Sequence, residues 1–106
     1  MRVQIKALSV NEAWKGRRFK TDKYKKYEKD MLLILPKMVI PPGKLELVVT
    51  FGLSSKLADT DNFLKQFIDC LQKKYNFNDR NIFRIIAEKV IVKKGAEYID
   101  FIINEF

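Results

Sequence analysis

The residues best suited to chemistry in this sequence lie in one short segment, residues 59–62 (DTDN), followed by Lys65 and Asp69. If a helix begins near Asp61, then Asp61, Lys65 and Asp69 are four residues apart and lie on one face of that helix. Asp59 falls in the loop just before it. Ionised carboxylates placed together repel one another unless a cation lies between them. The spacing therefore makes this segment a candidate metal site.

The ligand chemistry of such a site favours one class of metal. A site with only oxygen ligands favours Mg²⁺ or Mn²⁺ over zinc. A divalent ion beside a phosphodiester can lower the pKa of a water molecule and stabilise charge on the phosphate. Lys65 could add positive charge next to that phosphate or to the leaving oxygen.

The same residues also allow a purely structural interpretation. Asp59 or Asp61 could simply cap the helix, because acidic residues are common at helix N-termini. Asp61 and Lys65 could form an ordinary ion pair one turn apart, with Asp69 a solvated neighbour. The pattern alone does not decide between a metal site and a capped helix.

The absence of histidine narrows the possible chemistry. The chain has no His and one Cys. It therefore lacks a Ser-His-Asp triad, a Cys-His pair and an HExxH zinc site, and a zinc finger is not expected. Any catalysis must depend on carboxylates, lysines, tyrosines or a bound metal.

A formal net charge of +8 and a pI near 9.6 indicate a polyanionic partner. Anionic membrane is the rival partner, but no basic amphipathic segment with a clean apolar face stands out. Cationic side chains gather in the first loop and before the acids, and we expect phosphate contacts from Lys15, Arg17, Arg18, Lys20 and Lys56.

Three apolar side chains accompany this charge. Trp14 and Phe19 could stack on unpaired bases, although packing in the core or the loop is the alternative for Trp14. Leu57, between Lys56 and the acids, could wedge into opened DNA, or it could pack beneath its own loop.

The elements that must position these residues follow from periodicity. Strands are predicted at residues 2–8, 45–51, 82–92 and 97–103, and helices at 21–35, ending before Pro36, and at 61–75. Residues 9–20 are expected to form a loop. The turn signal at residues 93–96 (KKGA) suggests that the last two strands form a hairpin. The chain is thus predicted to be one α+β domain spanning 1–106, with a mixed β-sheet, two helices packed on it and the order β-α-β-α-β-β.

The longest apolar run, residues 31–35, is too short to cross a membrane, and the first residues do not resemble a signal peptide. We therefore expect a cytoplasmic protein. Cys70 agrees with this expectation because it has no partner in the chain for a disulfide.

The motif at 59–62 with Lys65 and Asp69, followed by residues 77–79 (FND) leading into a strand, resembles the RusA-type Holliday-junction resolvases. Those are small homodimeric endonucleases that cut four-way DNA junctions in a metal-dependent reaction. The resemblance begins near residue 9 and continues through Lys89 and the 93–95 turn to the last strand.

The resemblance implies roles for individual residues. Asp59, Asp61 and Asp79 match the metal-binding acids of the family, and Lys65 matches its catalytic lysine. Asn62 and Asp69 are implied to have supporting roles. The chain departs from the family pattern at Asn78, where relatives carry a second acid beside Asp79, and at Ala58, where relatives carry Pro. These departures leave open whether one metal or two is bound.

The resulting hypothesis is a homodimer that binds four-way DNA junctions and makes paired cuts with Mg²⁺, or Mn²⁺ as a substitute. Its interface is assigned either to the apolar tail 98–103 or to the tyrosine face of the first helix. Two alternatives are a non-catalytic basic nucleic-acid-binding module and a nuclease acting on other branched DNA. The sequence leaves open which bases are preferred at the cut. It also leaves open whether the protein acts in recombination, in repair or in the debranching of phage DNA.

Overall fold

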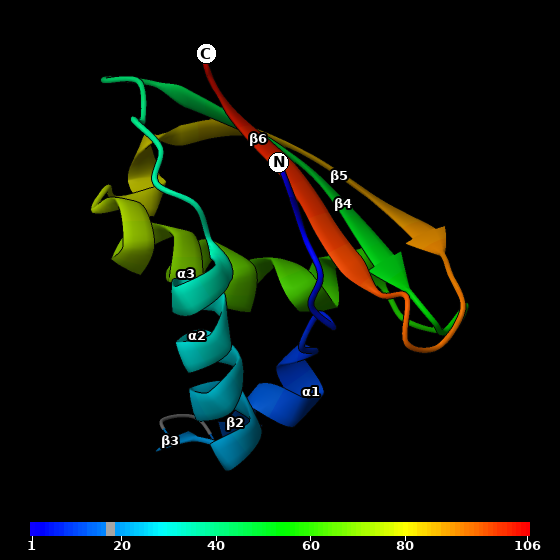
Figure 1. Ribbon diagram of the computed structural model, residues 1–106. Coiled ribbons are helices and arrows are strands. Elements are labelled where there is room, and N and C mark those ends of the chain that lie inside the picture. The colour runs from blue at the N-terminus through cyan, green and yellow to red at the C-terminus, as the bar shows by residue number, and fades with distance from the viewer. Residues whose placement is uncertain (17–18) are drawn as a thin grey trace.

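The computed structural model describes residues 1–16 and 19–106 (Figure 1). A four-stranded sheet has the order β1-β6-β4-β5, and a two-stranded ribbon joins β2 and β3. The elements in chain order are β1 (Arg2–Val3), α1 (Val10–Ala13), β2 (Trp14–Lys15), β3 (Phe19–Lys20), α2 (Asp22–Ile34), β4 (Leu45–Leu53), η1 (Thr60–Phe63), α3 (Leu64–Tyr75), η2 (Asp79–Asn81), β5 (Ile82–Ile91) and β6 (Tyr98–Glu105).

The sheet is mixed, as the sequence predicts. β4 pairs in parallel with β5, from Leu45 opposite Ile82 to Leu53 opposite Ile91, with a register shift after the first pair. On its other side β4 pairs antiparallel with β6, and β6 pairs with β1. Together with the helices this arrangement confirms a single α+β domain.

The predicted hairpin of the last two strands is wrong. β5 and β6 do not pair with each other, because β4 lies between them. The segment after β5 passes the end of β4, where the Val92 amide donates to the Leu53 carbonyl at 2.8 Å. The physical reason is the crossover through α3, which makes β5 parallel to β4 and leaves the other side of β4 for β6.

The predicted helices are present with small changes. Thr21 caps α2 by accepting from the Tyr24 amide, and Leu35 follows the last helical residue. The second helix begins as the 3₁₀ turn η1 before it continues as α3. Predicted strand 2–8 is shorter than expected, since only Arg2–Val3 pairs, and the expected loop 9–20 contains α1, β2 and β3.

The core lies between one face of the sheet and the helices α2 and α3. Phe67 of α3 packs edge-to-face on Phe51 of β4 and Phe101 of β6, with ring centroids 6.1 and 5.4 Å apart. Tyr24 and Met31 of α2 are fully buried beside them. This packing fixes α3 against the sheet and so determines where the acids at its two ends lie.

Within the described residues, no helix combines the length and the apolar character needed to cross a membrane.

Candidate active site

Asp59 and Asp61 lie where β4 has ended and α3 is about to begin. Asp59 is the residue before η1, and its side chain makes no capping hydrogen bond. Asp61 is the second residue of η1, and both side chains are exposed. Among the described residues, neither carboxylate takes part in an ion pair within the protomer. The geometry therefore leaves two neighbouring carboxylates free to bind a cation and does not support the capping alternative for Asp59.

Two interactions hold this turn in place. The Lys89 ammonium on β5 donates to the carbonyls of Lys56 and Ala58 at 3.1 and 2.7 Å, which fastens the loop directly before Asp59. On the core side of the turn, the fully buried Gln66 side-chain amide donates to the Asn62 carbonyl at 2.9 Å and to the Leu8 carbonyl at 2.8 Å. Asn62, predicted to support the site, contributes this carbonyl, and its own amide donates to the Asp59 carbonyl at 3.1 Å.

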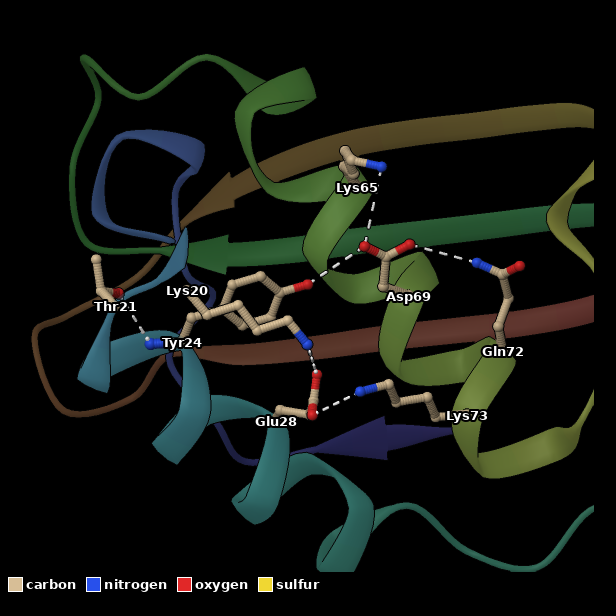
Figure 2. Close-up of polar contacts among 8 residues, drawn as sticks. All are labelled: Lys20, Thr21, Tyr24, Glu28, Lys65, Asp69, Gln72 and Lys73. Atoms are coloured by element: carbon tan, nitrogen blue, oxygen red, sulfur yellow. Dashed lines mark hydrogen bonds and ion pairs between the residues drawn. The ribbon is translucent and has the colours of Figure 1, made fainter. Parts of the chain in front are cut away.

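Lys65 and Asp69 lie one turn apart on α3 (Figure 2). The Lys65 ammonium is 3.9 Å from the Asp69 carboxylate, and the Lys65 side chain is 67% exposed. An exposed pair at this distance contributes little free energy, so the ammonium can move to another anion at small cost. The Asp61–Lys65 pair considered from the sequence is replaced by the pair Lys65–Asp69.

Asp69 connects the two long helices, α2 and α3, through hydrogen bonds. Its carboxylate accepts from the Tyr24 hydroxyl of α2 and from the Gln72 amide, both at 3.3 Å (Figure 2). Burial, and then the nearby Asp69 carboxylate, raise the pKa of Tyr24 well above its ordinary value, so the hydroxyl remains protonated and keeps donating. These contacts connect Asp69 to α2 and to the C-terminal half of α3.

Asp79 lies at the other end of α3. It is the first residue of η2, directly before β5, and its amide donates to the Gln72 side-chain oxygen at 2.8 Å. Its carboxylate is exposed. Gln72 thus connects the segment of Asp79 to Asp69 along the polar side of α3.

The structure brings Asp59 and Asp61 together, but it does not bring Asp79 to them within one chain. α3 contains 12 residues, and at 1.5 Å per residue it spans about 18 Å between the two ends. In Figure 1, η1 and η2 lie at opposite ends of α3. Consistently, no three acids, cysteines or histidines of the described chain form a group that could hold a metal ion.

The cations expected to contact DNA are in different environments. Lys15 and Lys56 are exposed. The Lys20 ammonium pairs with Glu28 at 2.8 Å and lies over the Tyr24 ring, so it is already engaged within the protomer. Arg17 and Arg18 lie outside the described residues.

The apolar side chains near the site also differ from one another. Leu57 is 93% exposed, so the expectation that it packs beneath its loop is wrong. Phe19 is 70% exposed, whereas Trp14 packs against the core with its ring edge-to-face on Tyr24. A shallow hollow of about 520 Å³ beside Lys65 is lined by Val10, Asn11, Trp14 and Gly16.

Lys89, Gln66 and Gln72 are positioning residues that the sequence did not reveal. Lys89 contacts the loop from more than 30 residues away in the chain, and Gln66 reaches back 58 residues to Leu8. Periodicity assigns such residues to an element but not to a partner. Gln66 carried one signal, a polar residue among apolar neighbours on the inner face of a helix.

The single cysteine is not a candidate nucleophile. Cys70 is fully buried in α3, and burial raises the pKa of its thiol to about 12. The thiolate is therefore essentially absent at neutral pH.

Comparison with known proteins identifies the family. The family model for endodeoxyribonuclease RusA matches residues 6–100, which include every described candidate of the site. A search of curated proteins found no match. Members of this family are metal-dependent phosphodiester hydrolases. The match covers most of the chain, and the chain therefore belongs to the RusA family of endonucleases that resolve Holliday junctions.

Proposed function

We propose that Asp59 and Asp61 hold the divalent cation of this nuclease together with Asp79 of a second subunit, because α3 separates them from the Asp79 of their own chain. Lys65 stabilises charge on the scissile phosphate. The observation that carries the proposal is the turn at the start of α3. It presents two exposed carboxylates without ion-pair partners among the described residues, beside a loosely held lysine. Carboxylate oxygens without histidine or thiolate neighbours favour Mg²⁺ or Mn²⁺.

When bound, the cation supplies charge neutralisation at the phosphate and lowers the pKa of a water molecule. The chain's own residues contribute position and charge. Lys89 and Gln66 fix the turn from both sides, so the two carboxylates keep their separation when DNA arrives. Lys65 can exchange Asp69 for a phosphate oxygen, because an exposed ion pair at 3.9 Å is weak.

DNA affinity in this proposal comes from exposed cations around the acids. Lys56 lies three residues before Asp59, and Lys15 lies on the β2–β3 ribbon next to the hollow beside Lys65. Lysine contacts to phosphates supply affinity without sequence information, so binding should weaken steeply with salt. In this proposal Leu57, which is exposed, enters a junction whose strands have separated.

The experiment that tests the assignment uses a synthetic mobile four-way junction in Mg²⁺ or Mn²⁺. Asp59→Asn and Asp61→Asn should abolish cutting and leave junction binding largely intact. Asp22→Asn is a matched control, because Asp22 is also an exposed acid in the first turn of a helix. Normal cutting by the Asp59 or Asp61 variant would show that these acids do not form the metal site.

The same assay decides how narrow the substrate range is. Forks, flaps and linear duplex are compared with the four-way junction at one salt concentration. We expect the junction to be cut fastest, because a two-fold homodimer with two sites matches the approximate symmetry of the junction. Equal rates on forks or flaps would favour the alternative of a general branched-DNA nuclease.

A further inference from the structure

Lys65 has an acid one turn away on each side, and in the structure it pairs with the second of them. Asp61 lies four residues before Lys65, and Asp69 lies four residues after it. The helical backbone is continuous from η1 into α3, since the Leu64 amide donates to the Asp61 carbonyl. In a helix, an acid that precedes a lysine by one turn gives the more favourable pair. Local sequence therefore favours Asp61, but the ammonium lies 3.9 Å from Asp69.

Tertiary contacts hold the Asp69 carboxylate ready for this pair. The Tyr24 hydroxyl of α2 donates to Asp69 Oδ2 at 3.3 Å, and the Gln72 side-chain amide donates to Oδ1 at 3.3 Å (Figure 2). Lys65 approaches Oδ2, the same oxygen that Tyr24 holds. The Asp69 side chain is only 28% exposed. A carboxylate that is already ordered and partly shielded from water is the better partner, because pairing costs less side-chain entropy and is less screened.

The Tyr24 side chain is itself held firmly. It is fully buried. The Trp14 ring packs edge-to-face on it with the centroids 5.3 Å apart, and the Lys20 ammonium lies 4.8 Å from its ring centroid. A ring packed in this way keeps its hydroxyl in one place. The position of the Asp69 carboxylate is thus determined by a residue that lies 45 positions earlier in the chain.

We propose that Tyr24 is a positioning residue of the metal site, which keeps Lys65 away from a carboxylate that must bind the cation. Its hydroxyl makes Asp69 the resting partner of Lys65, so the ammonium does not occupy Asp61. The inference rests on the proposed function, in which Asp61 binds the divalent cation. An ammonium paired with Asp61 would compete with that cation, because both are attracted by the charge of the same carboxylate.

Mn²⁺ binding to the DNA-free protein, measured by electron paramagnetic resonance, tests the inference. Tyr24→Phe keeps the packed ring and removes only the hydroxyl. The Asp69 carboxylate then loses one of its two hydrogen bonds, and Lys65 pairs with Asp61 for part of the time. The Kd for Mn²⁺ should rise about two- to fivefold, which is the extent to which an exposed ion pair can compete.

A second substitution separates positioning from a general structural effect. In a Lys65→Met background no ammonium is present to reach Asp61. Adding Tyr24→Phe to that background should therefore leave the Kd for Mn²⁺ unchanged, and the effects of the two substitutions should not add. Equal weakening by Tyr24→Phe with and without Lys65, or no weakening in either background, overturns the inference.

Tyr75→Phe is the matched control. The Tyr75 hydroxyl also connects α3 to the chain near α2, but it donates to the Pro36 carbonyl, at 2.7 Å, rather than to Asp69. This variant should bind Mn²⁺ as wild type does. A loss as large as that of Tyr24→Phe would assign the effect to the general docking of α3 and overturn the inference. Far-UV circular dichroism checks that both variants fold.

Zero-length coupling identifies the partner of Lys65 without any metal. A carbodiimide joins an amine to a carboxylate beside it as an amide, with loss of water, and fragmentation of the linked peptide identifies the acid. Wild type should couple Lys65 mainly to Asp69, and Tyr24→Phe should shift a measurable share to Asp61. Coupling that stays at Asp69 in the variant overturns the inference, and the proposed function is unaffected.

The failure of the proposed function gives a different result. If wild type binds Mn²⁺ no better than Asp61→Asn does, Asp61 is not a metal ligand and the proposed function is overturned. The coupling experiment then still decides whether Tyr24 sets the partner of Lys65, because it depends on the ammonium and the two carboxylates alone.

Discussion

β5 and β6 are the two strands that pair with β4, and they differ in how deeply their side chains are buried. Both are long, and each contains several isoleucines and one phenylalanine. β6 has a strand on each side, and its Ile99, Phe101 and Ile103 are buried under the helices. Among the described strands β5 has one neighbour, β4, and no residue along β5 is fully buried. Two strands of similar composition are thus used in one case for the core and in the other for the surface.

The difference shows that apolar content does not by itself indicate the core. The helices α2 and α3 lie on one face of the sheet (Figure 1), where residues of β4 and β6 are buried and those of β5 are at most partly buried. Apolar side chains in an exposed strand are costly for a protomer that stays alone. The contrast therefore separates what holds one chain together from what is available to a second chain.

The largest expected effect comes from the buried side of the comparison. Phe101→Ala should lower the free energy of unfolding by about 3–5 kcal/mol, because it empties space beneath Phe67 in a packed core. Urea denaturation followed by tyrosine fluorescence or circular dichroism measures the loss. A loss below 1 kcal/mol would mean that β6 is not the packed strand that its 2% exposed Phe101 indicates.

Gly52→Ala should be destabilising by about 1–3 kcal/mol. Gly52 of β4 lies opposite Tyr98 of β6, and a methyl group there would overlap the tyrosine ring. The tight contact is again on the β6 side of the sheet. Combining it with Tyr98→Leu should recover part of the loss, and an unchanged stability in Gly52→Ala alone would contradict the close approach.

Glu28→Gln should lower the free energy of unfolding by about 1 kcal/mol at neutral pH. Glu28 lies on α2, one of the helices packed on the sheet. Burial would raise the pKa of Glu28, but hydrogen bonds from Lys20 and Lys73 at 2.8 and 2.7 Å hold it below its ordinary value of 4.5 (Figure 2). Because the folded pKa is the lower one, this stabilisation is present above pH 4.5 and is lost as the pH falls through the folded value.

The difference between wild type and the Glu28 variant should therefore disappear in acid, as measured by urea unfolding at several pH values. Asp30→Asn is the matched control, because the Lys26–Asp30 pair of the same helix is at 2.7 Å but is much more exposed. We expect a change of less than about 0.5 kcal/mol for the control. A pH-independent loss for Glu28→Gln would assign its effect to packing.

The smallest effect is expected at the open edge. Phe83→Ala should change the unfolding free energy of the protomer by less than about 1 kcal/mol at low protein concentration, because the side chain is 56% exposed. A loss in the dilute protomer as large as that of Phe101→Ala would abolish the distinction between the two strands.

Much of the fold could be predicted from local pattern. The capped helix after Thr21, the strand at Leu45 and the last two strands all follow from periodicity and turn residues, since these signals depend on near neighbours. The hairpin at residues 93–96 could not be predicted correctly, because strand pairing depends on partners far away in the chain. The buried tyrosines of α2 and most of β6 were likewise interface candidates until the fold covered them.

For the site, the sequence by itself determined the kinds of groups available. With no histidine and one cysteine, chemistry must depend on carboxylates and lysine, and the DTDN segment with Lys65 supplies them. Only the tertiary structure decided which groups meet. It joined Asp59 to Asp61 through a turn fastened by Lys89, and it placed Asp79 at the far end of α3 beside an open strand. The reason is that a rigid helix separates residues that lie close together in the chain.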